Sequence, residues 1–194
     1  MPDFSGAYEV TPPWDIGRPQ PAFQALADAG RLLGRVLDAG CGTGEHALMA
    51  AALGLDATGI DAASNAIGLA RTKAQSLGLN VRFEVGDVVE LASLGEQWDT
   101  VLDSGCFHTM EDDERAAYVE NLHQVIPAGG RFFMLCFSDL QPGEFGPRRI
   151  TQEEIRRAFT DGWMVDSIEP ALMETNLEER DMRSWLATIT RTEH

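Results

Sequence analysis

A short apolar segment followed by alternating glycines constrains this chain more than any other feature. Residues 36–45 read Val-Leu-Asp-Ala-Gly-Cys-Gly-Thr-Gly-Glu, which predicts a strand, a turn containing Gly40, Gly42 and Gly44, and then a helix. Glycine adopts positive φ angles readily and lets a ligand lie against bare peptide groups. The segment therefore predicts a cradle for a nucleotide-type cofactor, with an unliganded tight strand-to-helix turn as the alternative.

The spacing of the glycines distinguishes a dinucleotide-binding turn from other nucleotide-binding turns. The dinucleotide fingerprint is Gly-x-Gly-x-x-Gly, whereas this chain has Gly-x-Gly-x-Gly, which leaves less room for a pyrophosphate at the helix end. Acids follow three further apolar segments: Asp61, which lies 23 residues after Asp38, then Asp87 and Asp103. The carboxyl ends of parallel strands form the ligand crevice of an α/β sheet, so these acids are expected there. For any one of them alone, a solvated or helix-capping acid is the alternative.

The order of elements predicts an α/β fold. Helices are expected at residues 22–29, 45–53, 63–77, 112–125 and 151–159, and strands at 35–39, 56–60, 81–88, 98–104, 131–137, 163–168 and 184–190. Alternating strands and helices indicate a parallel sheet with right-handed crossovers. The nearly continuous apolar run at 131–137 suits a central strand covered on both faces. Residues 12–21 and 138–149 stay irregular, and loops of this kind often carry substrate contacts.

These motifs together resemble the class I S-adenosylmethionine (SAM) methyltransferases. The resemblance implies a Rossmann-like, doubly wound, seven-stranded sheet that is mostly parallel with an antiparallel last strand, ending in a β-hairpin with its turn near residues 176–179. It implies one domain over residues 1–194, divided into an N-terminal lid and helix (1–30), a cofactor-binding core (35–137) and a substrate loop, helix and hairpin (138–194). It implies SAM as cofactor and S-adenosylhomocysteine as product. In this resemblance Asp61 binds the ribose hydroxyls and Asp87 binds the adenine amino group. The implied cofactor contacts are Asp38, Gly40, Cys41, Gly42, Gly44, Asp61, Ala62, Asp87, Val88 and Asp103.

A narrower resemblance starts in the proline-rich segment. Pro-Trp-Asp-Ile-Gly at residues 13–17, together with the glycine turn, is similar to small-molecule methyltransferases of the thiopurine, thiol/halide and tellurite-resistance groups. It is also similar to bacterial heterocyclic-toxin methyltransferases that act on planar compounds such as hydroxyquinolones. In this interpretation Trp14 covers the cofactor and Arg18 pairs with a carboxylate. The alternative is a strap that Trp14 docks on the core.

The acceptor side of the site is less constrained. A hydroxyl or ring N–H acceptor would benefit from a base, and His108, five residues after Asp103, is the best candidate. A loop histidine that only shapes the pocket is the alternative, and a thiolate or halide would need no base. Phe107, Met110 and Phe145 are expected to wall a flat acceptor, although aromatic residues at such positions are often core.

Composition and absent motifs narrow the function. The net charge of −16, from 31 acidic and 15 basic residues, disfavours nucleic acid as a partner. The Asn/Asp-Pro-Pro-Tyr/Phe motif of nucleobase amino-methyltransferases and the metal-binding Asp-Asn pair of catechol-type enzymes are missing, and the four histidines lack ligand spacing, so no metal is expected. We find no candidate signal peptide or membrane span, and three cysteines without metal or redox spacing favour the cytoplasm. A monomer or homodimer is expected. A nicotinamide reductase or a non-catalytic SAM-binding regulator remains an alternative.

Overall fold

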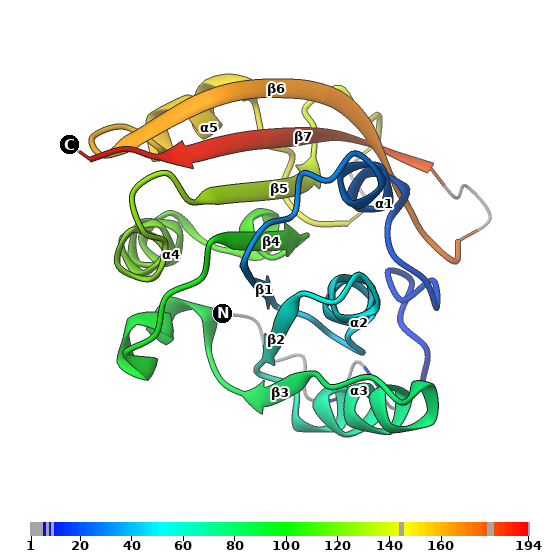
Figure 1. Ribbon diagram of the computed structural model, residues 1–194. Coiled ribbons are helices and arrows are strands. Elements are labelled where there is room, and N and C mark those ends of the chain that lie inside the picture. Colours follow the sequence, from blue (N-terminus) through cyan, green and yellow to red (C-terminus); the bar gives the residue numbers. More distant parts are fainter. Residues whose placement is uncertain (1–5, 7, 9, 144–145, 178–180, 194) are drawn as a thin grey trace.

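The computed structural model describes residues 6, 8, 10–143, 146–177 and 181–193, and one seven-stranded sheet organises them (Figure 1). Its strand order is β3-β2-β1-β4-β5-β7-β6. The strands are β1 (Arg35–Ala39), β2 (Asp56–Asp61), β3 (Arg82–Val85), β4 (Thr100–Ser104), β5 (Arg131–Phe137), β6 (Trp163–Glu174) and β7 (Asp181–Arg191). The first five are parallel, whereas β7 runs antiparallel to both β5 and β6. The predicted fold, a mostly parallel doubly wound sheet with an antiparallel last strand, is confirmed.

Helices cover both faces of the sheet and create two main cores. One face carries α1 (Pro21–Asp28), α2 (Glu45–Ala52) and α3 (Ser64–Leu77), and the other carries η2 (Val88–Leu94), η3 (Phe107–Thr109), α4 (Asp112–Val125) and α5 (Gln152–Ala158). On the second face Tyr118 and Leu122 of α4 pack with Phe132 of β5. The predicted capping box of α5 is present, because Thr151 and Glu154 each accept a backbone N–H of the other.

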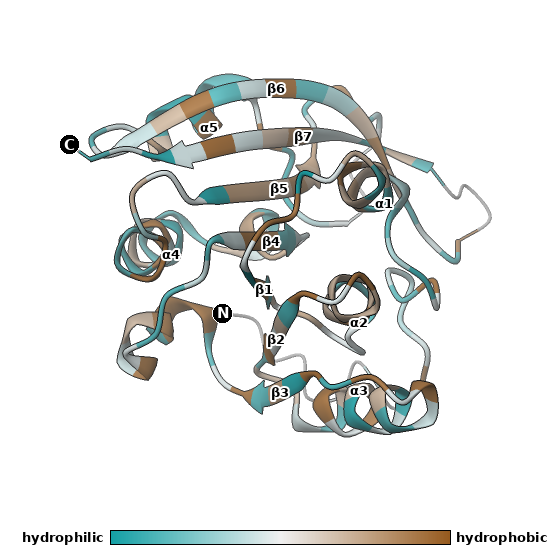
Figure 2. Ribbon diagram, in the orientation of Figure 1, coloured by the Kyte–Doolittle hydropathy of each residue, from teal (hydrophilic) through white to brown (hydrophobic). Residues whose placement is uncertain are grey.

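The sequence of β5 explains why this strand lies inside the sheet. After Arg131 the strand is apolar along its length, as its colour in Figure 2 shows, and every one of its residues from Phe132 onward is buried. A strand with no polar face must be covered on both sides. It therefore lies inside the sheet, between β4 and β7.

The terminal hairpin is longer than expected. Strand β6 continues past residue 168 to Glu174, through Pro170, and a bulge interrupts its pairing between Val165 and Ser167. Proline lacks an N–H but is tolerated in an edge strand, and β6 pairs only with β7. The extension carries Met173 to the carboxyl end of the sheet. Of the hairpin turn expected near residues 176–179, residues 178 and 179 lie outside the described residues.

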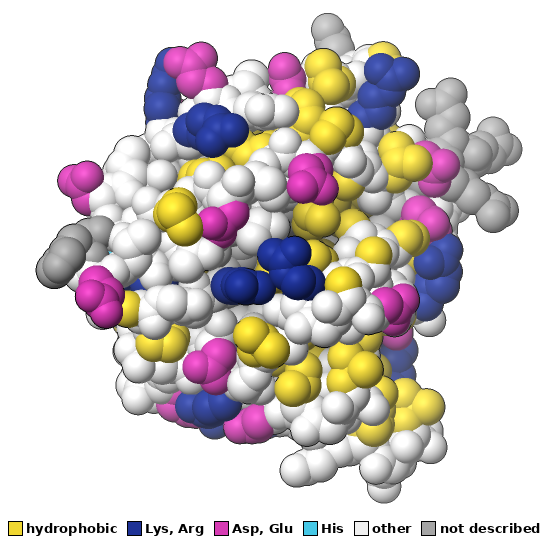
Figure 3. Space-filling model, turned by 45° about the horizontal axis from the view of Figure 1, so that its top comes forward, with side chains coloured by type: hydrophobic (Ala, Val, Ile, Leu, Met, Phe, Trp, Pro, Cys, Tyr) yellow, Lys and Arg dark blue, Asp and Glu magenta, His cyan; other side chains and the backbone are white. Residues whose placement is uncertain are grey.

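The surface over the terminal hairpin is mixed in charge. In Figure 3, which brings the β6 and β7 side of the molecule forward, acidic and basic side chains are interspersed with hydrophobic ones. Arg148 and Arg157 each form an ion pair with a glutamate, Glu154 and Glu153 respectively. Across the described residues, we find no helix that is both long and apolar enough to cross a bilayer.

Candidate active site

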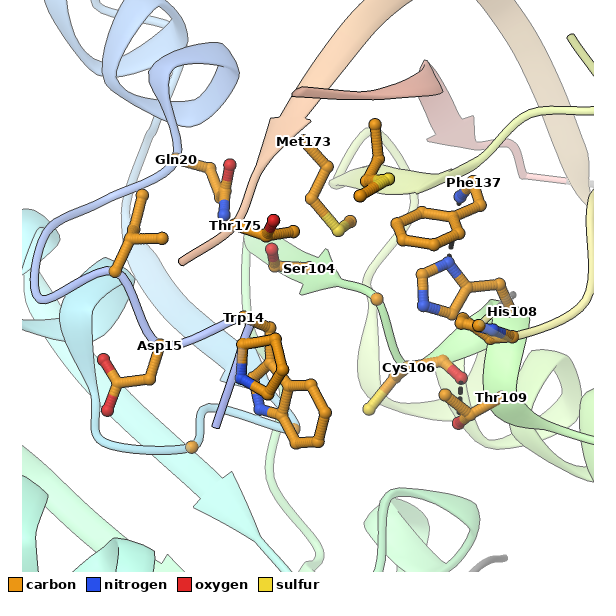
Figure 4. A pocket seen from close by; sticks show the side chains of 18 of the residues that line it. Trp14, Asp15, Gln20, Ser104, Cys106, His108, Thr109, Phe137, Met173 and Thr175 are labelled. Atoms are coloured by element: carbon orange, nitrogen blue, oxygen red, sulfur yellow. Dashed lines mark hydrogen bonds between the residues drawn. The ribbon is translucent and has the colours of Figure 1, made fainter. Parts of the chain in front are cut away.

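A cavity of about 520 Å³ opens at the carboxyl ends of β1, β2, β4 and β5 (Figure 4). Its size is typical of small-molecule sites, and its position is the crevice in which α/β sheets bind ligands. The cavity is walled by Tyr8 and the segment 13–20, by the glycine turn after β1, by the ends of β2 and β5, by the segments after β4 and β5, and by the β6–β7 hairpin. Eight predicted site residues line it: Trp14, Arg18, Gly40, Cys41, Gly42, Asp61, His108 and Met110.

The glycine turn has the conformation that its sequence predicts. Gly40, Gly42 and Gly44 have φ angles of +68°, +51° and +88°. A Cβ on Gly40 would lie 2.0 Å from Sγ of Cys106, and one on Gly42 would lie 2.6 Å from the Tyr8 hydroxyl oxygen. Neither position tolerates a side chain, so the backbone of the turn stays bare toward the cavity. Gly44 instead packs against Phe83 and starts α2.

Asp61 holds this turn in place from the end of β2. Its two carboxylate oxygens accept hydrogen bonds from Gly42 N–H and Ala63 N–H, each at 2.8 Å. Burial raises the pKa of Asp61, and these two backbone hydrogen bonds lower it in part. A carboxylate has about four acceptor positions, so Asp61 retains positions for ligand hydroxyls on the cavity side.

The N-terminal strap, residues 12–20, is fastened to the end of β6. The Gln20 side chain donates to the Glu174 carbonyl at 3.0 Å and accepts from the Glu174 N–H at 2.8 Å. Asn176 N–H donates to the Pro13 carbonyl at 2.7 Å, and Asp15 accepts from the Thr43 hydroxyl at 2.8 Å. Polar contacts therefore dock the strap across the cavity.

Two predicted site residues, Trp14 and Arg18, lie on the strap. Arg18 was expected to pair with a carboxylate, and its guanidinium pairs with that of Glu174 and so fastens the strap. Trp14 does not dock the strap on the core, because it is 43% exposed. Its ring lines the cavity, and its Nε1–H donates to the Tyr8 hydroxyl at 3.2 Å. This position is compatible with the predicted cover over a ligand.

Of the other predicted acids, Asp103 departs most from its expected role. It is fully buried under the segment after β4, and its oxygens accept from Cys106 N–H at 2.7 Å and Phe107 N–H at 3.1 Å. It therefore supports the cavity wall from behind and does not line the cavity. Asp38 similarly binds the Ala47 N–H at the start of α2, at 3.1 Å. Asp87 accepts from Val89 N–H at 3.1 Å and begins η2.

His108 is held in one orientation by the end of β5. Its Nδ1 accepts the Phe137 N–H at 2.9 Å, and the two rings meet edge to face at 4.6 Å. A neutral imidazole that accepts at Nδ1 carries its proton on Nε2. A methyl group on Gly105 would lie 3.2 Å from Nε2, so this nitrogen faces the cavity side of the segment (Figure 4).

The electrostatics of His108 do not favour the expected role of a base. Burial, together with the nearby charges of Arg115 and Arg149, lowers its pKa to about 3. The ring is therefore neutral at physiological pH. Its one nitrogen directed at the cavity bears a proton and has no lone pair for a second one.

Phe107 was expected to wall the cavity but does not form part of its wall. Phe107 is 1% exposed and packs in the core, with Arg115 stacked on its ring at 5.0 Å. Its N–H donates to the Asp103 carboxylate at 3.1 Å. Phe145 lies outside the described residues. The apolar wall instead comes from Phe137, Met173 and Met110 together with Met182 and Leu177.

Comparisons with known proteins agree with this geometry. Residues 36–130 match the family model of the methyltransferase domain. A 2-heptyl-1-hydroxyquinolin-4(1H)-one methyltransferase of Mycobacteroides abscessus is 37% identical over 168 residues, which cover 85% of this chain and 74% of that protein. This chain belongs to the methyltransferase family.

Solved structures extend the likeness over the whole fold of this methyltransferase. A structure described by the conversion of a disulfide bond into a thioacetal group during echinomycin biosynthesis has a TM-score of 0.89 and 38% identity, and covers 97% of this chain and 91% of that one. Magnesium protoporphyrin IX methyltransferase from Synechocystis PCC 6803, solved with SAM bound, shares the fold at a TM-score of 0.68 and 24% identity, covering 88% of this chain and 76% of that one.

SAM is the cofactor of this methyltransferase, and the residues around the glycine turn fit it. The bare backbone at Gly40 and Gly42 allows close approach of a ligand, and Asp61 offers a charged acceptor for hydroxyl groups. Tyr8 adds a second aromatic ring beside Trp14, at 6.4 Å between ring centres. Tyr8 was not among the predicted site residues, because no local sequence pattern indicates a site there.

Met173 and Gln20 were missed for different reasons. Met173 follows Pro170, and a proline predicts the end of a strand unless that strand lies at the edge of a sheet. Gln20 was part of the irregular segment, and only its partner Glu174, more than 150 residues away, shows its role. Cys106, interpreted as a buried small residue, is only partly buried and lines the cavity.

Asp103 gives a pH-dependent prediction for stability. Burial raises its pKa from 3.8 to about 7, so the folded protein retains this proton over a range where the unfolded chain releases it. Its stabilising contribution is therefore present below about pH 4 and is lost as the pH rises toward 7, at up to about 1.4 kcal/mol per pH unit. Urea unfolding of wild type and Asp103→Asn between pH 4.5 and 8 should show the wild type losing stability relative to the variant as pH rises. Parallel pH profiles would contradict the shift.

Proposed function

We propose that this methyltransferase transfers a methyl group from SAM to an oxygen or nitrogen of a small, planar aromatic or heterocyclic acceptor. The observation that carries the proposal is the cavity of about 520 Å³, in which the glycine turn and Asp61 form one half and an apolar wall of Phe137, Met173 and Met182 forms the other. Flat apolar rings suit such a wall. The relative from Mycobacteroides abscessus, which is named for a hydroxyquinolone, supports this acceptor class.

The proposed roles divide the site residues between the cofactor and the acceptor. SAM supplies a methyl group on a positively charged sulfur, and the protein has to align the acceptor with it and exclude water. Asp61 and neighbouring Ala62 bind the ribose, Asp87 and Val88 the adenine, and Trp14 covers the site. Asp38, Gly40, Cys41, Gly42 and Gly44 shape or support the cradle, and His108 and Met110 contact the acceptor.

A sulfur acceptor is the second candidate. The acceptor half of the cavity offers a neutral, protonated imidazole nitrogen rather than a base, and a thiolate needs none. The structure at 38% identity is described by chemistry at a disulfide bond, which supports a sulfur nucleophile. A thiol/halide-type S-methyltransferase is therefore kept as the alternative.

The proposal includes partners and location. The acceptor is a free small molecule, without a requirement for nucleic acid or a membrane, and the protein works as a monomer or homodimer. The formal charge of −16 supports the exclusion of a phosphate backbone. The free thiols of Cys41, Cys106 and Cys136 are compatible with the reducing cytoplasm.

Calorimetry followed by an acceptor screen tests the proposal. SAM and S-adenosylhomocysteine should bind saturably, whereas NADH should not. Mass spectrometry should then detect a gain of one methyl group on a hydroxyquinolone or a phenol, while methylation of thiols alone would favour the alternative. Binding of SAM without methylation of any compound from these classes would contradict the proposed acceptor.

A further inference from the structure

The acceptor half of the cavity is arranged for an anion. We propose, on the basis of the proposed function, that the acceptor binds in its ionised form, with its anionic oxygen or sulfur accepting a hydrogen bond from Nε2–H of His108. His108 is then a donor that selects acidic acceptors, such as phenols, N-hydroxy heterocycles and thiols. The protein takes no proton from the acceptor.

The first support is the fixed direction of the donor. The Phe137 N–H occupies Nδ1 of His108 at 2.9 Å, so the ring can neither turn over nor move its proton without losing this bond. An unsatisfied buried N–H costs about 1–3 kcal/mol. Nε2 lies beside Gly105, whose missing side chain leaves space there, and the methyl group of Met173 borders the same space. The donor therefore faces a space with apolar surroundings.

The second support is the charge around this donor. Arg149, from the segment after β5, lies 5.4 Å from the centre of the Phe137 ring, and Arg115 of α4 is 6% exposed beneath the segment that carries His108. Two carboxylates lie beside the Arg115 guanidinium, Glu154 of α5 at 3.9 Å and Asp112 of α4 at 3.8 Å. These carboxylates also pair with Arg148.

Burial is the main cause of the lowered pKa of His108 and opposes either sign of charge, whereas the additional lowering by Arg115 and Arg149 is specifically the effect of positive charge. The neighbouring β6 contributes Met173, which carries no charge. A positive potential that disfavours a charged imidazole favours a negative charge at the same place. A hydroxyl or thiol bound against Nε2–H should therefore ionise at a lower pH than it does in water.

The third support is that the acidic groups of the wall are already engaged. Among the described residues that line the cavity, Asp61 holds the glycine turn, Asp15 binds Thr43, Glu45 pairs with Lys73, and Glu111 caps α4. The thiol of Cys106 has a pKa well above its usual value because of burial. The acceptor consequently loses its proton to water, and its lone pair then forms the bond to the methyl carbon while the electron pair of the broken carbon–sulfur bond stays on sulfur.

A chromogenic probe tests ionisation directly. 4-Nitrophenol, whose anion absorbs visible light, is titrated from pH 4 to 9 with the protein saturated with S-adenosylhomocysteine. The bound probe should ionise about one pH unit or more below the free probe. A probe that binds only in its neutral form, or does not bind in its ionised form, overturns the proposal.

Two substitutions of the same residue separate a donor from a base. In His108→Asn the side-chain oxygen can still accept the Phe137 N–H, but the donor toward the cavity is lost, whereas His108→Gln can place an amide N–H near the position of Nε2. The asparagine variant should lose about 10- to 100-fold in affinity for ionised 4-nitrophenol, and the glutamine variant should retain most of it. Equal losses in both variants contradict the donor role.

A matched pair of arginine variants tests the charge. Arg149→Gln should reduce the shift in the ionisation of the bound probe, because Arg149 lies over the Phe137 ring. Arg157→Gln removes the same charge from the exposed side of α5, where its guanidinium pairs with Glu153, and should leave the shift unchanged. An unchanged shift in Arg149→Gln contradicts the electrostatic part of the proposal.

Methylation of phenols of graded acidity distinguishes this inference from the proposed function. The midpoint of the pH dependence of kcat/KM should follow the pKa of each acceptor. A midpoint that is the same for all acceptors indicates a base on the protein and overturns the inference while leaving the methyltransferase activity in place. Absence of methylation across the series, with SAM binding intact, instead contradicts the proposed acceptor class.

Discussion

Asp61→Asn is expected to lower the affinity for SAM by about 100-fold or more. Both carboxylate oxygens of Asp61 are in use, for Gly42 N–H and Ala63 N–H, and the amide group of asparagine can accept only one of these bonds. A hydrogen bond to a charged group contributes about 1.5–3 kcal/mol. The substitution removes one such bond from the cradle and weakens the proposed bond to the ribose, so a loss of about 3 kcal/mol is expected.

Asp56→Asn is the matched control for this measurement. Asp56 begins the same strand, β2, and its carboxylate contacts Arg35 at the surface, at 3.2 Å and away from the cavity. Calorimetric titration with SAM should therefore give the wild-type affinity for Asp56→Asn. If Asp61→Asn also binds SAM within a few-fold of wild type, the ribose role of Asp61 is wrong.

Gly40→Ala is expected to abolish SAM binding and to lower the free energy of unfolding by about 2–5 kcal/mol. Its φ of +68° costs about 1–2 kcal/mol for a residue with a Cβ. The new methyl group would also lie 2.0 Å from Sγ of Cys106, and overpacking of this kind costs about 1–3 kcal/mol. Relief of the contact requires the turn and the segment after β4 to separate, which changes the shape of both halves of the cavity.

Two further variants separate backbone strain from the clash. Gly54→Ala has a similar φ of +81° with no atom within 4 Å of the new Cβ, so it should show the strain alone and bind SAM normally. Adding Cys106→Ala to Gly40→Ala should recover part of the lost stability, because it removes the sulfur atom that the methyl group meets. Urea unfolding measures all four proteins, and a Gly40→Ala variant as stable as Gly54→Ala would contradict the clash.

The fold was predictable because its signals are local. The apolar run of β5 and the alternation of strands and helices each depend on neighbouring residues, and helix α4 (Asp112–Val125) has the bounds that its periodicity predicts. The errors lie at β3 and β6. Strand β3 ends at Val85 because Asp87 starts a 3-10 helix, and β6 runs through Pro170 because an edge strand needs no N–H there.

The candidate site also has some features that the local sequence predicts and others that depend on the folded chain. By itself the sequence determined the glycine turn, the position of Asp61 at the end of β2, and the family, since close backbone approach to a ligand requires glycine at fixed places along the chain. Only the tertiary structure decided the roles of Asp103, Arg18 and His108. The partners of Arg18 and His108, Glu174 and Phe137, come from distant segments, and the burial of Asp103 comes from the packing of the folded chain. Because hydrogen bonds and desolvation determine the charge and direction of a polar side chain, its chemistry depends on neighbours that only the folded chain supplies.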